Sequence, residues 1–191
     1  MNISREHLEL LSENFRNIDE TTKEIINLEA ILSLPKGTEH FLSDIHGEYE
    51  AFDHILRNGS GVIKEKLKEV FGNRLPKKEL NLLATIIYYP EEKLNLLKKE
   101  FSTAEYKEYQ KILLLRLLEV TQVAARKYTR SKVRKLLPKD FDYIIEELLY
   151  KMQTRDKEDY YEKILENIIE LGAGDKFIIE LSLSIHKLII D

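Results

Sequence analysis

Residues that break helices are rare in this chain and widely spaced. Seven glycines and four prolines occur among its 191 residues, whereas leucine, isoleucine, glutamate and lysine are abundant. Long intervals of good helix formers without glycine or proline are typical of helices joined by short turns. The sequence therefore predicts a mainly α-helical protein, arranged as a multi-helix bundle.

Amphipathic segments place several of these helices. One helix is expected over residues 3–15, and a second begins where Thr21 and Glu24 have capping-box spacing and ends before Pro35. Pro90 and Pro138 suit the first turn of a helix, which does not use the missing N–H. The longest predicted helix covers residues 103–128, with these residues facing inward: Tyr106, Tyr109, Ile112, Leu113, Leu117, Val120 and Ala124.

The composition excludes several classes of protein. Because the chain has no cysteine, it has neither disulfides nor thiolate metal sites, and any metal must use oxygen and imidazole ligands. No run approaches the roughly 20 apolar residues that span a bilayer, and the first residues lack the order of a signal peptide. A formal charge of -4 gives no basic field for nucleic acid. We therefore expect a cytoplasmic protein with neither a membrane nor a nucleic-acid partner.

One segment departs from the helical pattern and carries the clearest chemical signal, Asp44-Ile45-His46-Gly47. We predict a strand over residues 40–44, a turn at Gly47, a helix over residues 48–56 and a flexible loop over residues 57–61. Side chains two apart in a strand point to the same side, so Asp44 and His46 would converge on one cation. Carboxylate and imidazole suit manganese, iron or zinc.

The chemistry of such a site would be phosphate-ester hydrolysis. Two neighbouring cations can hold the attacking and leaving oxygens of a phosphate ester. The alternative is a structural motif, in which Asp44 caps the following helix and the backbone satisfies His46. The motif alone leaves both interpretations open.

Longer stretches around this motif resemble a known family. The segments from Leu34 to His54 and from Leu56 to Gly61 are similar to the amino-terminal signature of class III fructose-1,6-bisphosphatases of Firmicutes-type bacteria. Residues 88–94, 127–132 and 146–151 resemble later stretches of the same proteins. The resemblance implies a calcineurin-like metallophosphoesterase with a dinuclear manganese centre, in which Asp44 and His46 bind one ion. It also implies hydrolysis of fructose 1,6-bisphosphate to fructose 6-phosphate and phosphate in gluconeogenesis.

The same resemblance divides the single helical region of residues 1–191. The metallophosphoesterase core would start at residues 36–61, a helical insertion or cap would occupy residues 62–187, and a truncated core strand would start at residues 188–191. The family motifs Gly-Asp-x-x-Asp-Arg and Gly-Asn-His-Asp have no counterpart in this sequence. Two protein ligands rarely hold a dinuclear centre. We therefore expect an incomplete α/β sheet with one or two short strands, no assignable catalytic residue, and a chain that is inactive by itself.

A run of basic residues without an intervening acid is the second candidate site. It comprises Arg126, Lys127, Arg130, Lys132, Arg134, Lys135 and Lys139. Arg130, Lys132 and Arg134 are the candidates for holding a phosphate of the substrate or an anionic effector, because guanidinium groups bind phosphate in a bidentate way. The alternative is a solvated helix face.

A different class of function also fits the helical pattern. The chain could be a non-catalytic module for assembly or regulation, with Asp44 and His46 in structural roles. Exposed leucine, isoleucine and tyrosine on amphipathic helices would then pair two chains. We expect a homo-oligomer in either case.

Overall fold

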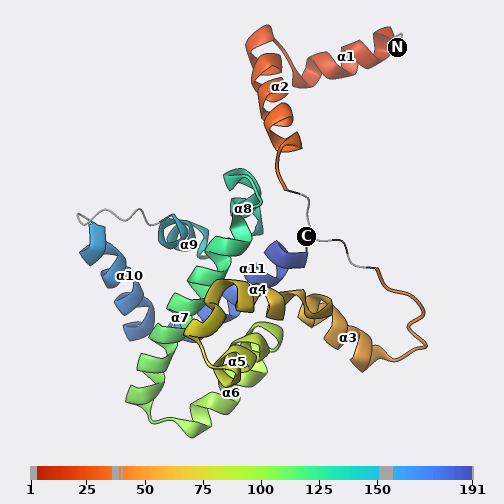
Figure 1. Cartoon of the computed structure of the whole chain (residues 1–191). Helices are drawn as coiled ribbons and strands as arrows, with labels where there is room; N and C mark the ends of the chain where they lie inside the picture. The colour runs from red at the N-terminus through yellow and green to blue at the C-terminus, as the bar shows by residue number, and fades with distance from the viewer. Residues whose placement is uncertain (1–3, 36–38, 40, 151–156, 191) are drawn as a thin grey trace. The chain divides into compact units, whose positions relative to one another are not determined.

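The computed structural model describes residues 4–35, 39, 41–150 and 157–190 (Figure 1). In these ranges the chain forms helices α1 to α11 and two short 3-10 helices, η1 and η2, and no strand. The prediction of a mainly helical protein is confirmed. Two compact units divide the chain, Met1–Lys36 and Gly37–Asp191.

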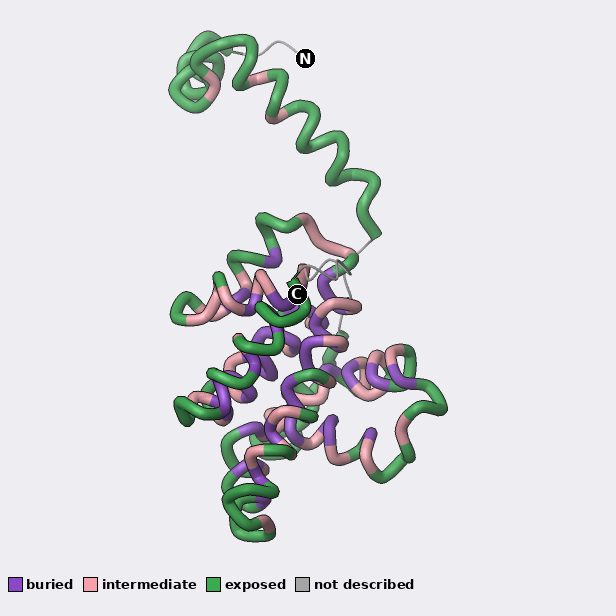
Figure 2. The backbone as a smooth tube through the Cα atoms, turned by 90° about the vertical axis from the view of Figure 1, so that its left-hand side faces the viewer, coloured by how far each residue is buried: buried purple, intermediate pink, exposed green. Residues whose placement is uncertain are grey.

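The first unit contains α1 (Arg5–Asn14) and α2 (Ile18–Leu32), and neither helix has a buried residue (Figure 2). The capping box predicted at Thr21 and Glu24 is wrong, because α2 begins earlier. The side chain of Asn17 accepts a hydrogen bond from the backbone N–H of Glu20 at 2.8 Å and so caps the helix. Thr21 lies inside α2, where its hydroxyl donates to the Asn17 carbonyl at 3.0 Å.

The second unit contains the remaining helices. They are α3 (Tyr49–Asn58), η1 (Gly59–Gly61), α4 (Val62–Phe71), η2 (Gly72–Arg74), α5 (Lys77–Tyr88), α6 (Pro90–Glu100), α7 (Thr103–Ala125), α8 (Arg130–Leu136), α9 (Asp142–Leu149), α10 (Glu158–Glu170) and α11 (Gly174–Ile190). Helices α7 and α11 pack along each other, and both contact α4, α6 and α10. This central pair organises the core.

Helix α7 begins where the sequence predicts and ends three residues earlier, at Ala125. Ser102 and Glu105 form a capping box, in which the Glu105 carboxylate accepts the Ser102 N–H at 2.9 Å. Leu113, Leu117 and Val120 are buried as predicted. Ile112 is not, since 46% of it remains exposed.

Helix α11 supplies a continuous apolar face to the core. Leu181, Ile185 and Leu188 recur at helical spacing, and each is fully buried. The strand predicted from Leu188 onward is therefore replaced by the last turn of α11, because Leu188 continues the same buried stripe. Asp191 lies outside the described residues.

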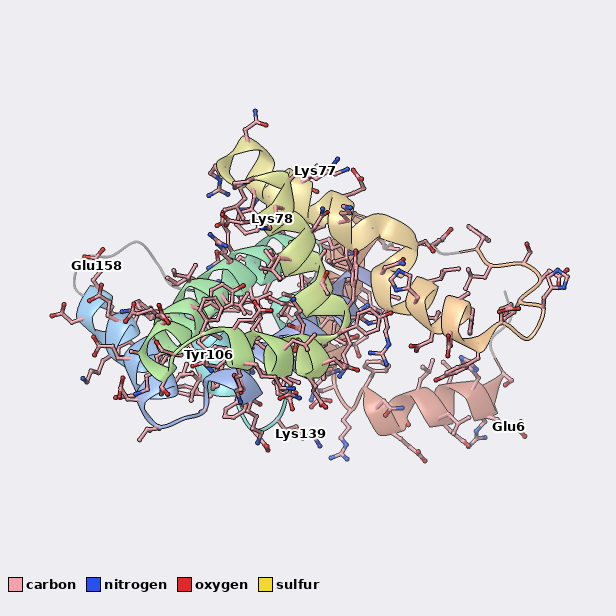
Figure 3. The ribbon with its side chains drawn as sticks, turned by 90° about the horizontal axis from the view of Figure 1, so that it is seen from below. Glu6, Lys77, Lys78, Tyr106, Lys139 and Glu158 are labelled. Carbon is pink, nitrogen blue, oxygen red and sulfur yellow. The ribbon has the colours of Figure 1, made fainter. Side chains whose placement is uncertain are left out.

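A polar cluster joins the start of α11 to α6 and α7. Asp175 accepts hydrogen bonds from the Tyr106 hydroxyl and the Gln110 amide, both at 2.7 Å, and forms an ion pair with Lys98 (Figure 3, which labels Tyr106). Burial by itself would raise the pKa of the Asp175 carboxyl, but these three partners outweigh it and hold the pKa below its ordinary value. A Cβ atom on Gly174 would lie 2.8 Å from the Gln110 side chain, so any larger residue would push Gln110 away from its hydrogen bond with Asp175.

The connections differ from the prediction at two places. Pro90 begins α6 as predicted, but Pro138 lies in the turn before α9. The loop expected over residues 57–61 is helical, since α3 continues to Asn58 and η1 follows. Gly59, with a φ of +58°, ends α3, and the Asn58 side chain accepts the Gly61 N–H at 3.0 Å. Among the described residues no helix is both long and apolar enough to cross a membrane.

Candidate metal site

The side chains of Asp44 and His46 meet at one accessible point. Oδ2 of Asp44 lies 2.9 Å from Nε2 of His46, and the two side chains are 71% and 75% exposed. At this distance the two groups contact each other directly as a histidine–carboxylate pair, and a cation that approaches from solvent would have to take the place of that contact to bind both. The sequence-predicted pair is therefore brought together.

The backbone achieves this convergence by a turn instead of a strand. Asp44, His46 and Gly47 have φ values of +40°, +51° and +75°, whereas a strand requires negative values. Phe41 to Ile45 belong to no helix or strand, so the strand predicted over residues 40–44 is wrong where the structure describes it, and His40 lies outside the described residues. Non-glycine residues with positive φ are uncommon and are concentrated at functional sites.

The turn leads directly into α3. The Glu48 N–H donates to the Ile45 carbonyl at 3.0 Å, and the Tyr49 N–H donates to the Gly47 carbonyl at 2.9 Å. Glu48 is the N-cap of α3 and no side chain caps this helix. The structural interpretation in which Asp44 caps α3 is therefore not what the chain adopts.

Polar contacts of His54 and Arg57 fix helix α3 to the helical body. Nδ1 of His54 lies 2.6 Å from the Tyr89 hydroxyl, and the two rings stack. Arg57 pairs with Asp53 at 2.7 Å, donates to the Tyr88 carbonyl at 3.3 Å and lies over the Tyr89 ring. Asp53 and Arg57 are four residues apart, a helical spacing that was the available signal. These contacts hold the helix that follows the Asp44–His46 turn.

The donor set fits part of a metal site. Oxygen and imidazole ligands suit manganese, iron and zinc. Among the described residues, however, no third histidine, aspartate or glutamate joins Asp44 and His46 in a possible metal cluster. The two residues fit one side of a single ion, and a dinuclear centre needs further ligands.

The basic candidates divide into two groups. Arg134 makes a bidentate pair with the Glu146 carboxylate at 2.8 and 3.0 Å, which raises the pKa of Arg134 and lowers that of Glu146. Arg130 lies 4.8 Å above the Tyr150 ring, and Lys132 lies 4.5 Å from the Tyr128 ring centre. A protein carboxylate thus engages Arg134, while Arg130 and Lys132 face aromatic rings.

Comparison with known proteins decides the family. The model of the Firmicute fructose-1,6-bisphosphatase family matches residues 6–191. The chain belongs to this family. It is 58% identical over 186 residues to the class 3 fructose-1,6-bisphosphatase of Alkaliphilus metalliredigens, covering 97% of this chain and 28% of that protein. No solved structure matches the chain.

Two further class 3 fructose-1,6-bisphosphatases match this chain over nearly the same length. The protein of Listeria monocytogenes is 53% identical over 190 residues, which cover 99% of this chain and 29% of that protein. The protein of Clostridioides difficile is 50% identical over 192 residues, which cover 100% of this chain and 29% of that protein. The chain therefore spans less than a third of the length of these class 3 relatives and corresponds to an amino-terminal portion of them.

Proposed function

We propose that this chain is the amino-terminal part of a cytoplasmic, metal-dependent phosphohydrolase that converts fructose 1,6-bisphosphate to fructose 6-phosphate and phosphate in gluconeogenesis. The observation that carries the proposal is the convergence of Asp44 and His46 at an exposed turn, within a chain of the Firmicute fructose-1,6-bisphosphatase family. The relatives' name supplies the substrate.

In this proposal Asp44 and His46 hold one ion of a manganese pair. Manganese, when bound, would neutralise charge on the phosphate and lower the pKa of a bound water. Asp44 supplies a negatively charged oxygen, and His46 supplies a neutral imidazole nitrogen. The turn at residues 44–47 presents both on the side open to solvent.

The helical body has a positioning role in this proposal. The contacts of His54 with Tyr89 and of Arg57 with the Tyr88 carbonyl fix α3 against the end of α5, and the pair with Asp53 within α3 orients Arg57. Since α3 starts two residues after Gly47, the same contacts restrict where the turn lies. The remaining metal ligands would come from residues outside these 191, because the sequence lacks the family's other ligand motifs.

A phosphate-release assay tests the proposal. The full-length protein, meaning this chain followed by the rest of its reading frame, should hydrolyse fructose 1,6-bisphosphate in the presence of Mn²⁺. Asp44→Asn and His46→Gln should each lower the rate about a hundredfold or more, since loss of a ligand disrupts the dinuclear centre. Lys78→Gln, which removes an exposed charge on α5, serves as the matched control.

The isolated chain gives the second half of the test. We expect no appreciable phosphate release from residues 1–191 with Mn²⁺. Robust metal-dependent hydrolysis by this chain would contradict the need for ligands elsewhere. Failure of the full-length protein to hydrolyse fructose 1,6-bisphosphate would contradict the function itself.

The rival proposal is a non-catalytic module for assembly, and one observation favours it. Helices α1 and α2 bury no residue, although Leu10, Ile18 and Leu32 are apolar and strongly exposed. Apolar surface of this kind is common at interfaces between subunits. Light scattering on the full-length protein would distinguish the two roles. An assembly role predicts that replacing Ile18 and Leu32 with serine reduces the mass of the oligomer. The rate of hydrolysis per active site should then stay unchanged.

A further inference from the structure

An acid-free cleft lies between the end of α7, the start of α8 and the end of α9, all of which are labelled in Figure 1. Its volume is about 440 Å³. The lining residues are Gln122, Ala125, Arg126, Tyr128, Arg130, Leu149 and Tyr150. Two arginines and two tyrosines thus face a space that no carboxylate lines.

No ion pair takes up the positive charge at this cleft among the described residues, although Arg130 lies near enough to Glu146 to help lower the pKa of that carboxyl. Within the described ranges, neither Arg126 nor Arg130 forms an ion pair with a carboxylate, in contrast to Arg134. Arg130 lies over the Tyr150 ring, and Lys132 lies over the Tyr128 ring. Cation–π contacts orient these groups but leave their charge in place. An anion would therefore be attracted to the cleft.

Helix electrostatics explain only part of this arrangement. Arg126 follows the carboxyl end of α7, where the helix dipole favours a cation. Arg130 is instead the first residue of α8, where the dipole disfavours a cation. Its place is therefore unfavourable for the helix itself, and the contact with the Tyr150 ring holds it there.

We propose that this cleft binds a phosphate monoester. The guanidinium groups of Arg126 and Arg130 would donate to the phosphate oxygens, and the Tyr128 and Tyr150 rings would contact the esterified group. Small-molecule sites commonly have volumes of roughly 300–1,000 Å³, and this cleft lies within that range. Gln122 already donates to the Leu149 carbonyl at 3.1 Å, so it supports the wall and is not a ligand contact. The formal charge of -4 argues against nucleic acid as the ligand.

Isothermal titration of the purified 191-residue chain at low ionic strength tests this site with three probes: inorganic phosphate, phenyl phosphate and fructose 1,6-bisphosphate. We expect saturable binding at one site. Arg126→Gln and Arg130→Gln should each weaken binding about tenfold, because each removes a charge-assisted hydrogen-bond donor. Arg130→Lys should weaken it less, since it keeps the charge and loses the planar fork.

A matched control tests whether binding depends on the arginines of this cleft or on any positive charge of the protein. Lys78→Gln removes the same charge from an exposed position on α5 (Figure 3) and should leave the affinity unchanged. Arg126 and Arg130 are exposed, so thermal melts followed by circular dichroism should be the same for all four variants. Amide shifts in NMR spectra should cluster at Tyr128, Arg130 and Tyr150.

The ranking of the probes identifies the recognised group. Equal affinities for the three probes mean that the site recognises the phosphate alone. Tighter binding of phenyl phosphate means that the tyrosines stack on its ring. Tighter binding of fructose 1,6-bisphosphate means that the tyrosines contact the sugar. The proposal is overturned if no probe binds, if Lys78→Gln weakens binding as much as an arginine variant, or if the amide shifts lie elsewhere. Because these assays measure binding to the chain alone, they do not depend on catalysis.

Discussion

The segment that carries Asp44 and His46 differs from the helical body that follows it. The body buries its apolar side chains and pairs most of its polar groups, whereas the segment leaves most of its side chains exposed. No residue of α3 is buried, and Asp44 and His46 are largely exposed and contact each other. The body instead buries a continuous apolar core and pairs most of the polar groups beside it, as at Asp175. The difference teaches that the body accounts for stability, whereas the turn at residues 44–47, here called the ligand turn, would need further ligands to bind a metal pair.

Shortening one side chain in each region should give the largest difference in unfolding free energy between the two regions. Leu181→Ala removes a fully buried side chain between α11 and α7 and should cost about 2–5 kcal/mol of unfolding free energy. Ile45→Ala, in the ligand turn at 45% exposure, should change it by less than about 0.5 kcal/mol. Urea unfolding followed by circular dichroism measures both, and equal losses would show that the turn belongs to the cooperative core.

A pair of glycine substitutions sharpens the same contrast. Gly174→Ala should cost about 1–3 kcal/mol, because its Cβ would press on the buried Gln110 side chain that holds Asp175. Gly47→Ala meets no atom within 4 Å, but its φ of +75° strains an alanine. We expect Gly47→Ala to spare the melting of the body and to weaken metal-dependent activity in the full-length protein. A drop in melting temperature for Gly47→Ala as large as that for Gly174→Ala would contradict this division.

Helix capping offers a smaller effect. Ser102→Ala removes the cap of α7 and should lower the unfolding free energy by about 1 kcal/mol. Asn17→Ala removes the corresponding cap of α2, which has no buried residue, and should leave the main unfolding transition unchanged. Chemical denaturation of the two variants in parallel gives the answer, and the account is wrong if Asn17→Ala shifts the midpoint more than Ser102→Ala.

A group in the helical body, the Asp175 carboxyl, should make the stability of the protein depend on pH. The pKa of the Asp175 carboxyl is held below its ordinary value, so its stabilisation is present above the unfolded-state pKa of about 3.9 and is lost as the pH falls through the folded-state pKa. Asp175→Asn should remove this acid-side slope. Thermal melts between neutral and strongly acidic pH measure it, and an unchanged slope in the variant would assign the effect to other groups.

The sequence predicted the body better than the ligand turn, for a physical reason. Helix α7 has a periodic apolar face and a capping box, both of which are local in sequence. The strand prediction assumed that Asp44 and His46 converge by alternation, whereas the chain uses positive φ at two non-glycine residues. No periodicity encodes such a turn. The sequence therefore predicted that the side chains of Asp44 and His46 lie together. It did not predict the backbone conformation that brings them together.

The basic run shows the same limit. Its charges could be counted from the sequence, but their partners could not. Glu146 neutralises Arg134 from a different helix, while Arg130 meets Tyr150. Only the fold separates Arg134, which pairs with Glu146, from Arg126 and Arg130, which line the acid-free cleft. The position of the candidate anion site thus depends on how α8 packs beside α9.

Manganese content of the full-length protein tests the central claim most directly. After equilibration with Mn²⁺ and removal of free metal, Asp44→Asn and His46→Gln should each retain at least one ion fewer per chain than the wild type, with unchanged melting of the helical body, and Lys78→Gln should retain the full content. Wild-type manganese content and affinity in both ligand variants would contradict the assignment of Asp44 and His46 as metal ligands.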